Sequence, residues 1–153
     1  MRISDDRAED SSGLRGTLEA LVRREDLVAA LRIKEAADDD LQFLLASTRQ
    51  PRVLRLMQQQ VEHLGIAISN LVNMFNPQAV LLAGFLSALY EADDYRLLNI
   101  IRSGSVTGPR ERVVIRTASL GSSGLAIGAA ELAFAPLLSS TTNFALVPLN
   151  ATG

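Results

Sequence analysis

Residues 53–84, VLRLMQQQVEHLGIAISNLVNMFNPQAVLLAG, decide the fold, because they combine a long helix, an Asn-Pro stop and a short apolar strand. Spacings of three and four place seven apolar side chains on one face of a helix of about six turns: Leu54, Met57, Val61, Leu64, Ile68, Leu71 and Phe75. From Leu64 onward the other faces are also largely apolar, so we expect the second half of this helix to be buried. Pro77 should end the helix at Asn76. Residues 79–83 then read as a short strand that is covered on both faces.

The segment before this helix predicts three shorter helices. Thr17 can cap the first of them, and a hinge near Arg23 and Arg24 separates the first helix from the second. The acidic run 38–40 stands at the start of a further short helix that ends at Ser47, where negative charge favours the helix dipole. The glutamines at 58–60 are expected to keep the first half of the long helix solvated on its other faces.

After the apolar strand, the pattern predicts a helix over 93–102 and a second strand over 112–118. A strand, a helix and a strand over this length form a βαβ unit, so we expect parallel strands and a right-handed crossover. A last helix, rich in small residues, should run from Ser122 to about Ala135, before Pro136. Two parallel strands make a poor sheet on their own. The chain therefore reads as part of a larger sheet domain, or as one that completes itself with a partner.

Composition excludes several classes of protein. The 153 residues carry a net charge of −2, no cysteine and one histidine. Disulfides, thiolate nucleophiles and cysteine-ligated zinc are therefore excluded, and the charge gives no sign of nucleic-acid binding. No apolar run is long enough to span a bilayer, and no signal peptide follows Met1. We expect a soluble, cytoplasmic protein that has no membrane contact and no cofactor.

Two blocks of sequence, 64–84 and 120–133, resemble the ROK family, which is named for repressors, open reading frames and kinases. The first block is the helix, the Asn-Pro stop and the strand, and the second is the Gly- and Ala-rich helix. The resemblance covers about residues 12–136. It implies an α/β fold, the C-terminal portion of an actin-like, ribonuclease-H-like sugar-kinase fold, helix-rich with a small parallel β component. We accordingly expect a flexible segment over 1–16, a ROK-like α/β domain over 17–136 and a tail over 137–153.

The resemblance also implies what this chain lacks. Family kinases have an Asp-Gly phosphate loop and an Asn-Asp pair whose aspartate is the catalytic base, and neither motif occurs in the sequence. Family repressors add an N-terminal winged helix, which is missing as well. We therefore expect no catalytic residue, no sugar kinase activity and no nucleic-acid binding by this chain.

Residues 10–19, DSSGLRGTLE, correspond to a CGCGxxGCxE run that binds zinc in other members of the family. Asp10, Ser12 and Thr17 stand where that run has cysteines, so we expect no metal site. Glu19 matches the family glutamate that bonds sugar hydroxyls, a role for which a carboxylate has two acceptor oxygens. The alternative is an ordinary carboxylate in the first turn of a helix.

The resemblance places four further residues near a nucleotide: Gly84, Ser122, Ser123 and Gly124. Gly84 matches the second glycine of a strand-end pair, where a missing side chain lets a ligand approach the backbone. The other three form a helix start, which can bind an anion. A plain strand end and a plain helix cap are the alternatives.

The favoured function is the C-terminal effector-binding and oligomerisation portion of a sugar-responsive ROK-type transcriptional regulator. Its expected partners are further copies of itself, through apolar surface at Leu54 and Met57, and, in the complete regulator, a sugar or sugar-phosphate effector. A fragment of a degenerate ROK sugar kinase and a freestanding oligomerisation module are the alternatives. The coding sequence upstream of Met1 distinguishes the first two, through a winged helix or an Asp-Gly loop.

Overall fold

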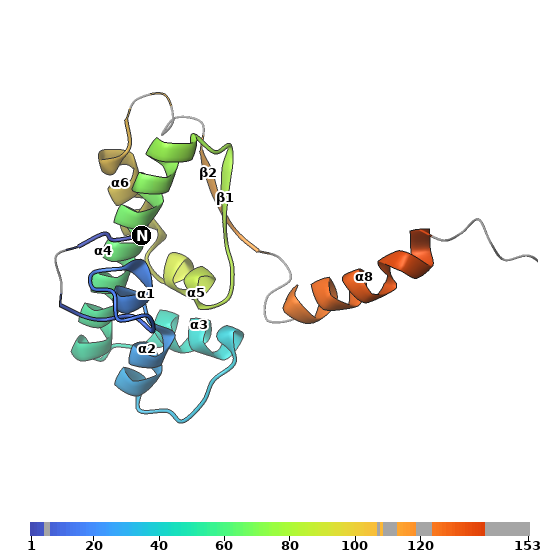
Figure 1. Cartoon of the computed structure of the whole chain (residues 1–153). Coiled ribbons are helices and arrows are strands. Elements are labelled where there is room, and N and C mark those ends of the chain that lie inside the picture. The colour runs from blue at the N-terminus through green and yellow to red at the C-terminus, as the bar shows by residue number, and fades with distance from the viewer. Residues whose placement is uncertain (5–6, 107, 109–112, 119–123, 140–153) are drawn as a thin grey trace, which may run out of the picture. The chain divides into compact units, whose positions relative to one another are not determined.

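The computed structural model describes residues 1–4, 7–106, 108, 113–118 and 124–139. The chain forms two compact units, Met1–Ser122 and Ser123–Gly153, and the second contains helix α8 (Gly124–Ser139). The elements of the first unit are, in order, α1 Leu18–Leu21, α2 Arg24–Leu31, α3 Asp38–Ser47, α4 Pro51–Phe75, β1 Ala79–Leu82, α5 Phe85–Ala92, α6 Asp94–Gly104 and β2 Val114–Thr117 (Figure 1). The predicted helix-rich fold with a small parallel β component is confirmed.

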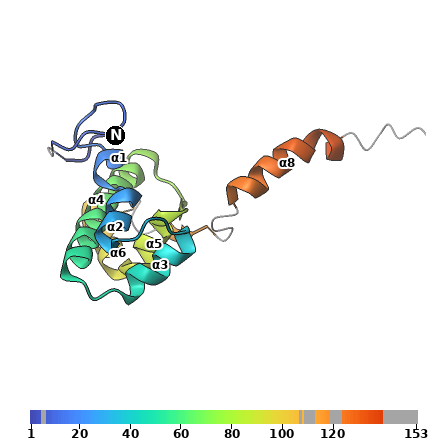
Figure 2. The same cartoon turned by 90° about the horizontal axis from the view of Figure 1, so that it is seen from below.

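Helix α4 is the centre of the first unit, as predicted. Pro51 lies in its first turn, and Asn76 ends it in the left-handed conformation, with φ of 45° and ψ of 51°. Helices α1, α2, α5 and α6 all pack against α4 (Figures 1 and 2). Six apolar side chains on α4 line the resulting core: Val53, Met57, Val61, Leu64, Ile68 and Val72.

The buried face of α4 differs from the predicted stripe at both of its ends. Val53 and Val72 are fully buried, whereas Leu54 and Leu71 are half-buried and Phe75 is 66% exposed. A strict alternation of three and four averages 3.5 residues per turn, so it drifts around a straight helix of about 3.6 residues per turn. The expectation that the whole second half is buried is also wrong for the last turn, where Met74 is 69% exposed.

Gln60 is buried, contrary to the prediction that the glutamine run is solvated. Its side chain is 1% exposed, and its amide nitrogen donates a hydrogen bond to the carbonyl oxygen of Arg23 at 2.9 Å. Buried polar side chains persist where they find such partners. The bond ties the junction of α1 and α2 to the middle of α4.

Strands β1 and β2 pair in parallel, as predicted, with Ala79 opposite Val114 and Leu82 opposite Thr117. Val80, Leu82 and Ile115 turn toward the core. On the other face, Leu81 is 67% and Val114 is 45% exposed. The prediction of a strand covered on both faces is therefore wrong for β1, because the described residues bury only one side of this sheet.

Two helices differ from the sequence pattern. Helix α5 is not predicted; Gly84, at φ of 60°, turns the chain into it directly after β1. Helix α8 was expected to end before Pro136 but continues to Ser139. A proline within a helix removes one backbone hydrogen bond without always ending the helix.

None of the helices in the described parts of the chain is both long and apolar enough to cross a membrane.

Candidate functional site

Glu19 lies in a cleft of about 520 Å³ in the first unit, between the N-terminal segment, the junction of α1 and α2, and the start of α5. Thr17 is the N-terminal cap of α1, because its hydroxyl oxygen accepts a hydrogen bond from the backbone N–H of Ala20 at 3.3 Å. This cap satisfies an otherwise free helix donor and places Glu19 in the first turn. The cleft is lined mainly by polar side chains, among them Asp10, Ser11, Glu19, Arg23 and Glu25, with Phe85 as its aromatic member.

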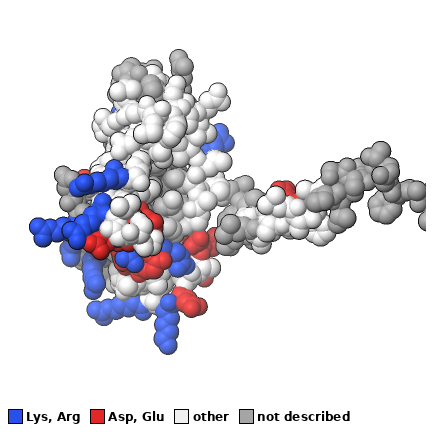
Figure 3. All heavy atoms as spheres, in the orientation of Figure 1, with Lys and Arg blue, Asp and Glu red and all other residues white. Residues whose placement is uncertain are grey.

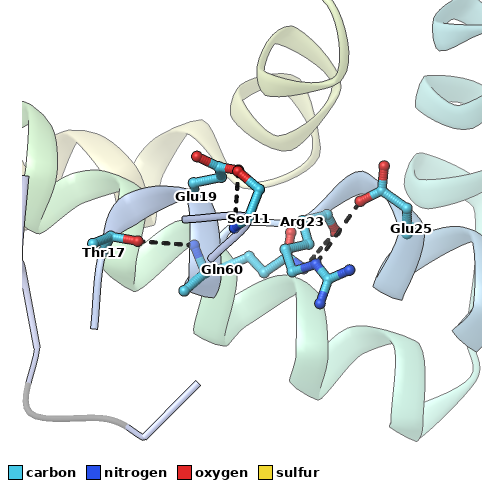
Figure 4. Close-up of polar contacts among 7 residues, drawn as sticks. Ser11, Thr17, Glu19, Arg23, Glu25 and Gln60 are labelled. Carbon is cyan, nitrogen blue, oxygen red and sulfur yellow. Dashed lines mark hydrogen bonds and ion pairs between the residues drawn. The ribbon is translucent and has the colours of Figure 1, made fainter. Parts of the chain in front are cut away.

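Ser11 holds the carboxylate of Glu19 (Figure 4). The hydroxyl of Ser11 donates to Oε1 of Glu19 at 2.6 Å, and the backbone N–H of Ser11 donates to the same oxygen at 3.4 Å. No hydrogen bond from the described residues reaches Oε2, and the side chain is exposed. Glu19 therefore presents an oriented acceptor to the cleft.

Figure 4 also shows Arg23 and Glu25, which lie apart from Ser11 and Glu19 and whose side chains point toward one another. Their charged groups are 4.0 Å apart and exposed, so the pair is weak and its donors can turn to a ligand. The backbone beside them is better fixed, because Gln60 bonds the carbonyl of Arg23. Sequence reasoning missed Gln60. Its spacing of three from Met57 and four from Leu64 is the signal that could have found it.

Asp10 anchors the loop that leads into α1. Its carboxylate accepts hydrogen bonds from the hydroxyls of Ser12 and Thr17, both at 2.7 Å, and from the backbone N–H groups of Ser12 and Leu14, both at 2.9 Å. The hydroxyls of Ser12 and Thr17, assisted by those two N–H groups, lower the pKa of Asp10 from 3.8 to about 2. The carboxylate is therefore charged at any ordinary pH.

Acid should release this anchor only at very low pH. Because the pKa of Asp10 is depressed in the folded chain, its stabilising effect is complete above pH 3.8 and is lost as the pH falls through about 2. We expect the carboxyl carbon resonance of Asp10, followed by NMR, to titrate with a midpoint near 2. A midpoint near 3.8 would show that the hydrogen bonds do not favour the charged form.

Gly84 lies in a separate cleft of about 180 Å³ at the carboxyl ends of β1 and β2. Asp38, Asp39 and Glu91 also line this cleft. A Cβ atom at Gly84 would lie 3.1 Å from Oδ2 of Asp38, so a larger residue at this position would crowd that carboxylate. Like charges repel, so Asp39 and Glu91, together with Asp38, whose charge Arg24 partly offsets, oppose a nucleotide phosphate here.

The two clefts meet at the start of α5. Phe85 lines the Glu19 cleft, and its neighbour Gly84 lines the acidic one. Arg24 from the first cleft donates through Nε to Oδ1 of Asp38 in the second at 3.0 Å. The structure thus places Glu19 and Gly84 in adjoining clefts and not in one pocket. Charged side chains of both signs gather over the region of α1 and α2 (Figure 3).

The remaining predicted site residues are Ser122, Ser123 and Gly124. Ser122 and Ser123 fall outside the described residues, and Gly124 begins α8 in the second unit. In the described ranges, no group of three or more His, Cys, Asp or Glu side chains could hold a metal ion.

This chain is similar to a protein family and to solved structures. A family model described as ROK family matches residues 3–135. A solved structure described as a ROK family transcriptional regulator, homolog of the E. coli MLC protein, is similar with a TM-score of 0.57 and 20% identity. The likeness covers 76% of this chain and 33% of that one, so this chain spans about a third of the neighbour's length. No curated protein matches. The shared fold confirms the predicted sugar-kinase architecture of the actin-like type.

Proposed function

Because this chain belongs to the ROK family, we propose that it is the effector-binding and oligomerisation portion of a sugar-responsive transcriptional regulator. The observation that carries this proposal is the Glu19 cleft, where the carboxylate at the family's sugar-binding position is held by Ser11 at 2.6 Å. The similarity to a structure described as a regulator supports the regulatory assignment. We assign DNA binding to a part of the regulator outside these residues, and we place this portion in the cytoplasm with it.

The chemistry of the cleft suits a sugar. Carboxylates at Glu19 and Glu25 accept hydrogen bonds from hydroxyls, and the guanidinium of Arg23 donates them. Phe85 supplies an apolar surface for the C–H face of a sugar ring. The volume of about 520 Å³ falls in the range of roughly 300–1,000 Å³ that is typical of small-molecule sites.

The acidic cleft argues against the alternative of a degenerate sugar kinase. A kinase needs a cradle of donors and positive charge around the transferred phosphate. The cleft around Gly84 instead contains Asp38, Asp39 and Glu91. Within the described residues, therefore, the site supports recognition of an uncharged sugar better than phosphoryl transfer.

Calorimetric titration with a panel of uncharged hexoses tests the proposal. We expect one or more of them to bind, and Glu19→Gln to weaken binding roughly tenfold to a hundredfold, because a charge-assisted hydrogen bond is lost. Asp26→Asn is the matched control, since Asp26 is an exposed carboxylate on α2 that does not line this cleft. The proposal fails if no sugar binds, or if Glu19→Gln binds as tightly as the unchanged chain.

Self-association is expected through the exposed face of the sheet. The sequence suggested Leu54 and Met57 as the apolar contact, but Met57 is only 5% exposed. Leu81 and Val114 are the better candidates for the contact, because burial of an exposed apolar sheet face against a second copy is favourable. Sedimentation at micromolar concentration should give a dimer or larger species. Leu81→Lys should shift it toward monomer, whereas Tyr95→Lys, which changes a side chain exposed on α6, should not. A monomeric unchanged chain would contradict this part of the proposal.

A further inference from the structure

Both oxygens of the Asp10 carboxylate are engaged in the loop 10–17. Oδ1 accepts from the N–H and the hydroxyl of Ser12 and from the N–H of Leu14, and Oδ2 accepts from the hydroxyl of Thr17. Two backbone bonds close the same loop: the N–H of Asp10 donates to the carbonyl of Leu14 at 2.9 Å, and the N–H of Gly13 donates to the carbonyl of Asp10 at 3.0 Å. One carboxylate thus joins the beginning of the loop to its middle and to its end.

Asp10, Ser12 and Thr17 are the three residues that stand in place of the family's zinc-binding cysteines. The structure brings the three side chains together, but their chemistry does not fit a metal. The two hydroxyls donate their protons to the carboxylate, whose four hydrogen bonds leave at most one lone pair, on Oδ2, for a cation. Zinc sites also require deprotonated sulfur, nitrogen or carboxylate ligands, usually four of them.

We propose that Asp10 is a positioning residue, which cross-links the loop 10–17 by hydrogen bonds in place of a metal and thereby holds Ser11 against Glu19. Ser11 lies between Asp10 and Ser12, and both of these belong to the cross-link. Thr17 donates to Asp10 and also caps α1, the helix that carries Glu19. Both sides of the contact between Ser11 and Glu19 are therefore fixed by the same carboxylate.

The consequence for ligand binding rests on the proposed sugar site, whereas the cross-link itself does not. Without Asp10, the hydroxyl of Thr17 loses its acceptor and the N–H groups of Ser12 and Leu14 lose theirs. The loop then keeps only its backbone hydrogen bonds, so a ligand must supply the remaining order, and that ordering weakens affinity. The depressed pKa of Asp10 agrees with a carboxylate that remains charged and bonded throughout the neutral range.

Hydrogen exchange followed by NMR tests the cross-link without any ligand. We compare the unchanged chain with Asp10→Asn and Asp10→Ala, and use Asp26→Ala as the control on an exposed carboxylate. The amides of Ser12 and Leu14 should exchange at least tenfold faster in Asp10→Ala. Asp10→Asn, which keeps one acceptor oxygen, should be intermediate, and the amides of the buried part of α4 should be unaffected. Equal protection in all variants would overturn the inference. If Asp10→Ala does not fold, Asp10→Asn and Ser12→Ala decide, since each removes part of the same cross-link.

Metal and sugar provide two further readouts. Added zinc and added chelator should leave the melting temperature of the unchanged chain where it is. A rise with zinc or a fall with chelator would overturn the inference that hydrogen bonds replace a metal in this loop.

For a sugar that the unchanged chain binds, affinity should fall in the order unchanged, Asp10→Asn, Asp10→Ala. An unaltered affinity in Asp10→Ala would refute the positioning role. If no sugar binds, the proposed function fails, and the exchange experiment still decides whether Asp10 holds the loop.

Discussion

Ile68→Asp is expected to unfold the chain or to prevent its soluble expression. Ile68 is 2% exposed and belongs to the core around α4, so the new carboxylate would be buried without a partner. Burial of an unpaired charge costs several kcal/mol, which is comparable with the whole stability margin of about 5–15 kcal/mol for a domain. Circular dichroism during heating measures the effect on any soluble fraction.

Asn70→Asp is the matched control for this substitution. It adds the same carboxylate two residues further along α4, but at an exposed position. This variant should be soluble and should melt within a few degrees of the unchanged chain. A soluble Ile68→Asp chain with an unaltered melting temperature would contradict the placement of the core.

Gly65→Ala is expected to destabilise the contact between α4 and α6. A Cβ atom at Gly65 would lie 2.7 Å from Cγ2 and 2.9 Å from Cβ of Ile100, which is closer than carbon atoms approach without displacement. Overpacking of this kind costs about 1–3 kcal/mol, whereas the same change at an open helical position gains up to about 1 kcal/mol. The melting temperature should therefore fall by several degrees.

Gly128→Ala supplies the comparison, because Gly128 lies within α8 and nothing is within 4 Å of the added Cβ. That variant should melt at or slightly above the temperature of the unchanged chain. If Gly65→Ala proves as stable as Gly128→Ala, α4 and α6 can move apart at little cost in free energy, and the close approach at Gly65 is unimportant for stability.

Local pattern was sufficient for the elements with a strong period or a clear stop. The long helix, its end at Asn76, the hinge near Arg23 and the parallel strands all follow from spacing and from Pro and Gly positions. Pattern was insufficient where an apolar side chain has no neighbour in the described chain. Phe75 and Leu81 look like core residues in the sequence and are exposed in the structure. Periodicity reports which residues prefer burial, but not whether another element is there to cover them.

The candidate site was predictable in part, and only through the family resemblance. Glu19 and Gly84 were found in this way, but the resemblance could not indicate that they lie in adjoining clefts. The bond between Gln60 and Arg23 joins residues 37 positions apart, so no local pattern contains it. Asp10 was read only as the loss of a metal ligand. Its role depends on four hydrogen bonds that appear when the loop is folded.

Chemical-shift mapping with a bound sugar tests the central claim most directly, namely that this chain is an effector-binding portion with its site at Glu19. Backbone amide spectra are recorded while the tightest sugar of the hexose panel is added to the unchanged chain. The account predicts saturable shifts concentrated at the residues of one cleft, Ser11, Glu19, Arg23 and Phe85, with α6 unaffected. Shifts confined to residues around Gly84 and Asp39, or no saturable shift with any sugar, would contradict it.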